Sequence, residues 1–342
     1  MNIQSNVRIN RTKMLDEAAL NHRPTHYIHT FLIFLLVYGI VSLAREFVVS
    51  IPTAIYLMGN ETFVDAVFAY LSKTIGAEEF TITVNSIAAT LPWYVWLVNL
   101  LSAGLLIVGA IIYCKKFEKR SIASLGFRKT SYALEYLVGM LIGAAMYLLS
   151  TLIAYLTGSI EIVSGDGFSW MIILFFVAFV IQGAGEEVFL RGYLMTSIAR
   201  DYKVALALIF SSAVFSLLHA SNTGVGIVAM INIFLFGVFE GIYVLKRGDI
   251  IGACAIHSIW NFTQGNILGS SVSGMSAMPS IFRMIPNMSM KASNGGEFGL
   301  EGGYAVTIVV LVAIGILMLT PPKRSALPEY ELLREEPNSN QE

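Results

Sequence analysis

Charged residues are scarce in this sequence. Asp, Glu, Lys and Arg make up 13% of the 342 residues, whereas hydrophobic residues make up 56%; an ordinary soluble domain carries about 25% charged residues. The mean hydropathy is +0.69. Repeated apolar runs of roughly 20 residues occupy most of the chain and leave no room for a soluble domain. The composition therefore predicts an all-α, polytopic membrane helix bundle that has the lipid bilayer as a partner.

A basic excess and cysteine clusters are also lacking. The formal net charge is −1, which argues against nucleic acid as a partner. The two cysteines, Cys114 and Cys254, match no disulfide framework and no metal-binding spacing, so we expect free thiols. The final residues, NSNQE, are not a prenylation box, so we expect no lipid anchor on the protein itself.

Apolar runs predict eight membrane-spanning helices. They cover residues 30–58, 82–113, 132–156, 168–200, 205–220, 225–245, 250–268 and 304–320. Residues 1–29 and 321–342 are then tails on either side of an integral bundle at 30–320. The triplet Ser42-Leu43-Ala44 could end a cleavable signal, but the apolar run resumes at Phe47 and continues to Met58, so we prefer a permanent span.

The connections between spans carry an asymmetric charge. If alternate loops are cytoplasmic, starting with the N-terminus, 18 of the 22 Lys and Arg residues lie on that side and three lie outside. This predicts that both termini are cytoplasmic and supports an even number of spans. Apolar residues at helical spacing between Val64 and Ile75 predict a short helix, either on the membrane surface or in an ordinary loop. We interpret the last external loop, residues 269–303, as a mobile or partly ordered linker, with a substrate gate as the alternative.

Three charges interrupt the fourth span. Ionisable residues at membrane depth are costly, so Glu186, Glu187 and Arg191 indicate a functional site. Glu187 and Arg191 are four residues apart with the acid first, which favours a supporting ion pair. Glu186 points about 100° away on the helix and is left as the unpaired carboxylate, suited to take a proton from water.

Two further polar clusters occur in spans five and seven, where Phe215 precedes His219 and His257 precedes Asn261 by four residues each. His257 and Asn261 share a helix face and could donate hydrogen bonds to an oxyanion. Glu186 lies 16 residues before Tyr202, where we place the turn, and His219 lies 17 after it. Both therefore stand roughly 25 Å from that turn, and we expect the clusters to meet.

The alternative for each residue is structural. The ion pair could serve packing only, and a lone intramembrane His or Asn is commonly an interhelical hydrogen-bonding group. The convergence of Glu186, His219, His257 and Asn261 favours chemistry. Four other polar residues are interpreted as packing, gating or supporting groups, namely Gln182, Asn232, Glu240 and Gln264.

The motifs that carry these residues resemble a known family. EEVFLR at 186–191, FSLLH at 215–219 and HSIWN at 257–261 resemble the EExxxR, FxxxH and HxxxN motifs of the CPBP family, the CAAX-protease and bacteriocin-processing (Abi) intramembrane proteases. SLGFRK at 124–129 resembles a cytoplasmic segment that precedes the core of that family. The resemblance covers roughly residues 120–268. It implies an eight-helix endopeptidase like the type II CAAX prenyl endopeptidases.

The resemblance also implies roles for individual residues. Glu186 would activate water with help from His219, and His257 and Asn261 would hold the oxyanion, with Glu187 and Arg191 in support. The family has been described as metalloproteases, so Glu186, His219 and His257 are alternative zinc ligands. Because no HExxH motif or compact ligand pair is present, we expect that no cofactor is required. Glu240 departs from the small or apolar residue that the resemblance leads us to expect.

The implied substrate is a peptide or protein, prenylated or embedded in the membrane. Eukaryotic members of the family trim prenylated CAAX termini, whereas bacterial members are implicated in peptide processing, bacteriocin immunity and surface-protein control. The short tails favour a bacterial cell membrane protein. Two other functions remain alternatives: a non-catalytic scaffold or bacteriocin-immunity protein that binds a partner, and a proton-coupled transporter, for which no inverted repeat is evident.

Overall fold

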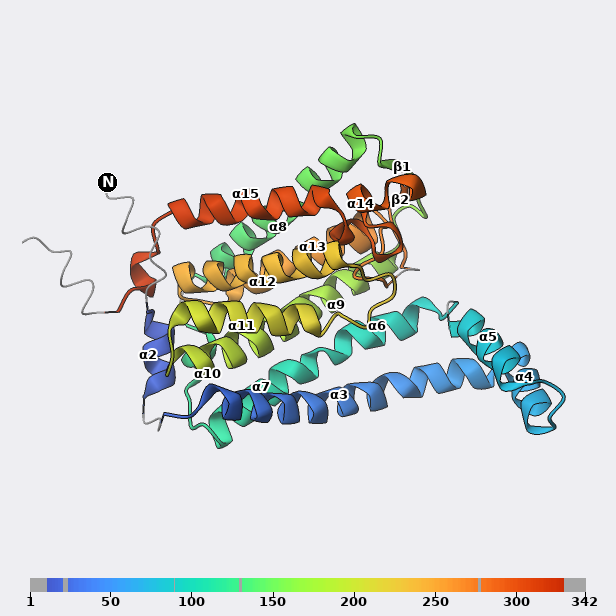
Figure 1. The fold of residues 1–342 in the computed structure, drawn as a ribbon, viewed down its shortest axis with the longest axis horizontal. Coiled ribbons are helices and arrows are strands. Elements are labelled where there is room, and N and C mark those ends of the chain that lie inside the picture. Colours follow the sequence, from blue (N-terminus) through green and yellow to red (C-terminus); the bar gives the residue numbers. More distant parts are fainter. Residues whose placement is uncertain (1–10, 21–23, 89, 129–130, 276–277, 329–342) are drawn as a thin grey trace, which may run out of the picture.

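The computed structural model describes residues 11–20, 24–88, 90–128, 131–275 and 278–328. Long helices lie along a common direction and form one bundle (Figure 1), which confirms the all-α membrane bundle. Five helices in these ranges are long and apolar enough to cross a membrane. They are α3 (Tyr27–Met58), α6 and α7 together (Trp93–Lys116), α8 (Tyr132–Leu156), α9 with its continuation (Trp170–Ala199) and α12 (Ile227–Arg247).

Shorter helices account for the remaining predicted spans. They are α11 (Val204–Leu217), α15 (Tyr304–Leu319), and α13 (Ile251–Phe262) with the π-helical segment η3 (Thr263–Ile267) that extends it. Each of the eight predicted spans therefore contains a helical segment in the structure. Five of the eight segments have the length expected for a full crossing.

The predicted start of the second span, at Ile82, is wrong. Residues 77–88 form a separate helix, α5 (Ala77–Ala88), and α6 (Trp93–Ser102) begins after a break. Pro92 occupies the N-cap of α6 in an extended conformation, at φ −69° and ψ 155°. Proline lacks an N–H and disfavours the helical conformation of the residue before it, so one helix cannot run through this point.

The C-terminal end of α3, α4 (Glu61–Leu71) and α5 form an arm at one end of the molecule. Helix α4 contains most of the predicted short helix, and Asn60 caps it by accepting a hydrogen bond from the Phe63 amide at 3.0 Å. In Figure 1, α4 and α5 lie at the far end of α3, beyond the ends of the other long helices. The bundle that holds the site is therefore built from the remaining length of α3 and from α6 onward.

Glycines allow the helices around the site to pack closely. Gly139 and Gly143 lie four residues apart on α8, and a Cβ atom added at Gly143 would lie 2.5 Å from the Ile256 carbonyl oxygen on α13. A Cβ at Gly183 on α9 would lie 2.6 Å from the Ser258 hydroxyl of α13. Small residues at such spacing let helix backbones approach in membranes. Helix α13 is thus held between α8 and α9.

The fourth predicted span changes its helical form near the charged motif. Helix α9 (Trp170–Glu187) continues as a π-helical segment, η2 (Val188–Met195), and then as α10 (Thr196–Ala199). All eight residues of η2 are buried. Short π-helical segments within α-helices occur frequently at functional sites. The change of form begins directly after Glu187.

The loop at residues 269–303, which the sequence predicts to be external, is more ordered than a linker would be. It contains β2 (Phe282–Pro286), η4 (Met288–Met290), α14 (Lys291–Asn294), η5 (Gly296–Phe298) and η6 (Leu300–Gly302). Strand β2 pairs antiparallel with β1 (Ile160–Ser164), so that Ile160 faces Pro286 and Ser164 faces Phe282. The Asn294 side chain donates to the Ser159 carbonyl oxygen at 2.6 Å. This small sheet was not predicted from the sequence, because the pairing joins segments more than 100 residues apart.

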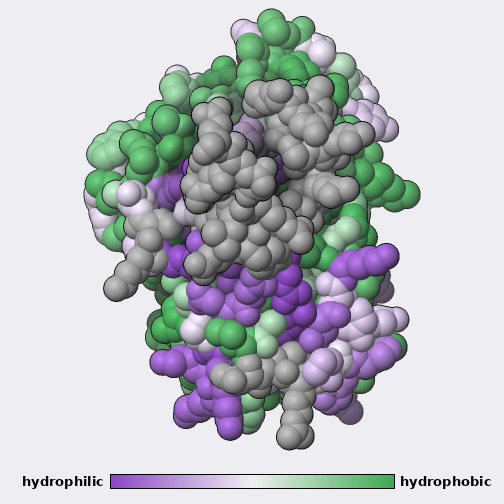
Figure 2. All heavy atoms as spheres, turned by 90° about the vertical axis from the view of Figure 1, so that its left-hand side faces the viewer, coloured by the Kyte–Doolittle hydropathy of each residue, from purple (hydrophilic) through white to green (hydrophobic). Residues whose placement is uncertain are grey.

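The opposite end of the bundle carries α2 (Lys13–Ala19), η1 (Ile122–Leu125) and η7 (Arg324–Ala326). Figure 2 shows this end face on. Hydrophilic side chains gather over its lower part, and hydrophobic side chains border them. The elements near both chain ends therefore lie on the same side of the bundle, whereas the assignment of that side to the cytoplasm stays a prediction.

Candidate functional site

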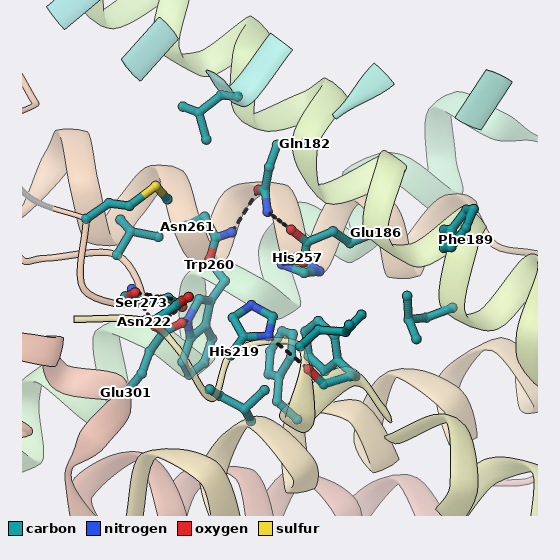
Figure 3. A pocket seen from close by; sticks show the side chains of 18 of the residues that line it. Gln182, Glu186, Phe189, His219, Asn222, His257, Trp260, Asn261, Ser273 and Glu301 are labelled. Atoms are coloured by element: carbon teal, nitrogen blue, oxygen red, sulfur yellow. Dashed lines mark hydrogen bonds and ion pairs between the residues drawn. The ribbon is translucent and has the colours of Figure 1, made fainter. Parts of the chain in front are cut away.

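A cavity of about 210 Å³ lies among the helices of the bundle. Its wall is formed by residues of α3, α6, α7, α9, η2, α11, α12, α13 and α15, by the turn after α11 and by the external loop (Figure 3). The polar residues that line it are Arg45, Asn99, Gln182, Glu186, His219, Asn222, Asn232, His257, Asn261, Ser273 and Glu301. Glu186, His219, His257 and Asn261, the four residues expected to converge, all belong to this wall.

His257 lies close to the carboxylates of two adjacent residues of the fourth span, Glu186 and Glu187. Its Nδ1 atom is 2.9 Å from Oε1 of Glu187, and its Nε2 atom is 3.7 Å from Oε2 of Glu186. An ionised carboxylate only accepts hydrogen bonds, so Nδ1 carries a hydrogen and Nε2 is directed toward Glu186. Glu187 therefore orients His257 in addition to pairing with Arg191.

The predicted ion pair between Glu187 and Arg191 is present. Arg191 Nη1 donates to Glu187 Oε1 at 2.9 Å, and both side chains are fully buried. The Arg191 guanidinium also lies over the ring of Phe215, 4.5 Å from its centroid. Removing either partner of such a buried pair strongly destabilises the folded protein, because the other charge stays buried without compensation.

His219 is held by the first residue of its own motif. Its Nδ1 atom lies 2.9 Å from the Phe215 carbonyl oxygen, so Nδ1 donates, and among the described residues no hydrogen bond occupies Nε2. Figure 3 shows the His219 ring within the cavity, on the side opposite Gln182 and Glu186. The Phe215 ring packs edge-on against both histidines, with centroid distances of 4.9 Å to His219 and 5.9 Å to His257. Phe215 thus contacts both imidazoles and helps to fix their planes.

Gln182 joins two of the predicted residues. Asn261 Nδ2 donates to Gln182 Oε1 at 2.9 Å, and Gln182 Nε2 donates to Glu186 Oε1 at 2.7 Å (Figure 3). One Asn261 hydrogen is used in this bond, and the amide nitrogen has a second one to donate. The sequence alone predicts a packing, gating or supporting role for Gln182. The sequence does place Gln182 four residues before Glu186, on the same helix face, and this spacing allows the direct hydrogen bond that the structure shows.

The external loop forms the roof of the cavity, so it is not a plain linker. Glu301 Oε1 accepts a hydrogen bond from Trp260 Nε1 at 3.0 Å, and Glu301 Oε2 accepts two from Ser273, from its amide at 3.0 Å and its hydroxyl at 2.8 Å. Asn222 Nδ2 donates to the Ser273 carbonyl oxygen at 2.9 Å. Ser273 has a positive φ of 47°, a conformation that non-glycine residues adopt rarely. These contacts fasten the roof to α13 and to the turn after α11.

The other polar residues have mainly structural contacts. Asn232 lines the cavity and donates to the carbonyl oxygens of Glu301 and Gly303 at 2.7 and 2.9 Å. Gln264 donates to the Ser271 carbonyl oxygen at 2.5 Å. Glu240 is fully buried on α12 outside the cavity wall, and within the described ranges neither of its carboxylate oxygens has a hydrogen-bond partner. Glu240 therefore does not line the cavity.

The zinc alternative requires a cluster of ligands. Within the described parts of the chain, no group of three or more His, Cys, Asp or Glu side chains is arranged to hold a metal ion. The set of Glu186, His219 and His257 therefore does not fit a metal site in this arrangement. The cofactor requirement itself stays a prediction.

The fold and the cavity together define a class of protein, a multi-pass membrane protein with a polar site among its helices. The family model described as type II CAAX prenyl endopeptidase Rce1-like matches residues 168–263. This segment is an Rce1-like domain, as the three motifs predicted, and it carries all four predicted site residues. A search of curated proteins and a search of solved structures found no match. The match of this segment supports an intramembrane endopeptidase, a membrane hydrolase that acts on peptide bonds.

Proposed function

We propose that the protein hydrolyses a peptide bond of a membrane-associated substrate by means of a water molecule that Glu186 activates. The observation that supports this most directly is the state of the Glu186 carboxylate. Oε1 is held by Gln182, whereas Oε2 has no hydrogen-bond partner within the described ranges and faces His257. A fixed carboxylate with one free oxygen in a cavity is suited to accept a proton from water.

The remaining residues supply the rest of the reaction. Water gives one proton to Glu186, and its oxygen bonds to the carbonyl carbon of the peptide. His219 Nε2, left free by the bond from Nδ1 to the Phe215 carbonyl oxygen, accepts a hydrogen bond from the same water and orients it. The proton on Glu186 then passes to the amine as the C–N bond breaks. No other reactant is required.

Two groups can stabilise the oxyanion that forms on the carbonyl oxygen. Asn261 Nδ2 has one hydrogen left after its bond to Gln182. His257 can donate from Nε2 as an imidazolium, the form that the flanking Glu186 and Glu187 carboxylates stabilise. Donors that are already oriented in a water-poor site stabilise such a charge more than solvent does. The proposed function thus uses each of the four predicted residues.

The substrate is proposed to be a peptide or protein that reaches the cavity from the membrane, either prenylated or membrane-embedded. The apolar outer surface of the bundle supports this, since Leu43 and Phe47 on α3 are among many large exposed hydrophobic residues. A cell-membrane location in a bacterium, with both termini cytoplasmic, is proposed on the asymmetry of Lys and Arg. No cofactor is part of the proposal.

The test is Glu186→Gln in purified protein, assayed against a mixed pool of apolar peptides in lipid vesicles. We expect cleavage to fall by about 10²- to 10⁴-fold, because glutamine cannot accept the proton. Glu79→Gln, at an exposed position on α5, is the matched control and should retain wild-type cleavage. Equal cleavage by wild type and Glu186→Gln would refute the proposal. A cellular phenotype that also survives Glu186→Gln would instead favour a partner-binding scaffold.

A further inference from the structure

Arg45 places a permanent positive charge deep within the first long helix. It lies 18 residues after the start of α3 at Tyr27 and 13 residues before its end at Met58. At 1.5 Å per residue these intervals are about 27 and 20 Å. A cation at such depth is costly and is typically retained for function. Helix α3 lies outside the matched segment, residues 168–263.

The side chain of Arg45 reaches the cavity and is only partly satisfied there. Its Nε donates to the Ser102 hydroxyl at 3.2 Å, and within the described ranges no further hydrogen bond or ion pair is recorded for it. Ser102 in turn donates to the Asn99 carbonyl oxygen at 2.6 Å, which fixes the acceptor of the bond from Arg45. A guanidinium has five N–H groups, so both Nη groups of Arg45 remain available to a ligand.

Two buried arginines of the described chain, Arg191 and Arg120, are used differently. Arg191 is paired with Glu187, and Arg120 donates to Glu118, to three hydroxyl groups and to two carbonyl oxygens. Arg191 pairs within its own helical segment and lies over Phe215 of α11, and Arg120 joins the segment before η1 to η2 and α10. Arg45 has no comparable set of partners, although it faces a cavity where a peptide is proposed to bind.

The opposite part of the wall carries a charged residue, Glu301, that has hydrogen-bond partners where Arg45 has few. Glu301 lines the same cavity, but three hydrogen bonds from Trp260 and Ser273 saturate its carboxylate. It precedes α15, which lies on the far side of the bundle from α3 (Figure 1). A peptide across the cavity therefore meets a satisfied acid at one side and an unsatisfied cation at the other. Apart from Glu186, which is assigned to the activation of water, the charge that the wall leaves available to a peptide is the positive one.

We propose that Arg45 determines substrate specificity by binding a carboxylate of the peptide through its two Nη groups. A planar guanidinium matches a carboxylate with two parallel hydrogen bonds. Asn99, which also lines the cavity, provides an amide donor on the same part of the wall. The carboxylate can belong to the C-terminus of the peptide or to an Asp or Glu side chain. This inference rests on the proposed function only in taking the cavity as the peptide site.

The test compares three fluorescent pools of apolar peptides that are otherwise free of Asp and Glu. One pool ends in a free carboxylate, the second in an amide, and the third in an amide with one Asp added. Binding and kcat/KM are measured for wild type, Arg45→Gln, Arg45→Lys and the control Arg283→Gln. Arg283 is exposed on β2 outside the cavity wall. The substitution Arg283→Gln therefore removes the same charge as Arg45→Gln without changing the wall.

For wild type we expect binding and kcat/KM to favour one of the two carboxylate-bearing pools over the amide pool by about 10- to 100-fold, as charge-assisted hydrogen bonds allow. Arg45→Gln should reduce that ratio to about 1, Arg45→Lys should restore part of it, and Arg283→Gln should keep it. The pool that is preferred identifies the source of the carboxylate. Expression and thermal unfolding show that each variant is folded.

Three results would overturn the inference: no preference in wild type, a preference that survives Arg45→Gln, or an equal loss for all three pools. The last result would mean that Arg45 assists Glu186 or stabilises the fold and does not select the substrate. The binding measurement separates this inference from the proposed function. If no pool is cleaved by wild type but Arg45→Gln still abolishes the preference in binding, the proposed function fails and the role of Arg45 stands.

Discussion

The Nδ1 atom of His257 lies 2.9 Å from Oε1 of Glu187, the same oxygen that accepts a hydrogen bond from Arg191 at 2.9 Å. A single carboxylate therefore links the histidine of α13 to the arginine of η2. It fixes the plane of the imidazole and directs Nε2 toward Glu186. The second glutamate of the motif thus acts on the proposed chemistry through His257.

Removing the charge of Glu187 should impair the reaction without removing a group that touches the substrate. In Glu187→Gln the imidazolium of His257 loses a carboxylate partner and Arg191 loses its ion pair. We expect kcat to fall by about 10²- to 10⁴-fold, as for other residues that act through proton transfer, while KM changes little. Steady-state kinetics measure the two separately.

The control for this change is Glu161→Gln, at an exposed position of β1, which should behave as wild type. A thermal unfolding curve shows how much of the effect is structural. If Glu187→Gln raised KM and left kcat unchanged, the orienting role would be wrong.

Asn261 is expected to contribute to stabilisation of the oxyanion. Asn261→Ala removes the remaining Nδ2 hydrogen and should lower kcat by about 10²- to 10³-fold, the range seen when one oxyanion donor is lost. Gln182→Ala should lower kcat too, because Gln182 holds both Asn261 and Glu186. Asn85→Ala, exposed on α5, is the matched control. Wild-type kcat in Asn261→Ala would contradict the assignment.

Close packing of α8 against α13 should be sensitive to one added methyl group. In Gly143→Ala the new Cβ would lie 2.5 Å from both the Ile256 carbonyl oxygen and Ile259 Cγ2. We expect stability to fall by about 1–3 kcal/mol, the usual cost of overpacking, and activity to fall with it because α13 carries His257. Thermal unfolding in detergent is the measurement. Gly315→Ala on α15, where nothing lies within 4 Å, should be neutral or stabilising.

The roof of the cavity should loosen when the carboxylate of Glu301 is neutralised. Glu301→Gln can accept at only one atom in place of the two oxygens that Trp260 and Ser273 now use. We expect faster hydrogen exchange at the Ser273 amide. The effect on exchange is about 10-fold or more, since hydrogen bonds to charged groups contribute about 1.5–3 kcal/mol. Glu297→Gln, exposed in the same loop, should leave exchange at Ser273 unchanged. Equal exchange in both variants would show that Glu301 does not hold the roof.

The expectation that no cofactor is required has its own test. Cleavage by the purified protein should persist in a strong chelator, and metal analysis should find less than one zinc per chain. Loss of cleavage that added zinc restores would instead support a metal site at Glu186, His219 and His257. The chelator assay tests for loosely held metal, and the metal analysis tests for tightly held metal.

Much of the fold was predictable from local sequence properties. Apolar runs located all eight helical segments, because a helix in a bilayer must satisfy its own backbone and present apolar side chains around its length. The boundary of the second span was predicted wrongly, although Pro92 was visible in the sequence as a reason for a break. The sheet between β1 and β2 depends on a contact distant in sequence and left no comparable signal.

The sequence alone determined which residues were candidates for the site, since Glu186, His219, His257 and Asn261 are polar groups in spans that otherwise exclude them, and their motifs carry the family resemblance. Only the tertiary structure decided how they connect: that Glu187 holds His257, that Gln182 joins Asn261 to Glu186, and that the external loop closes the cavity. It also brought Arg45 from α3 into the same wall. The physical reason is that spacing along one helix defines which residues share a face, whereas contacts between helices depend on close packing, here permitted by glycines such as Gly143 and Gly183.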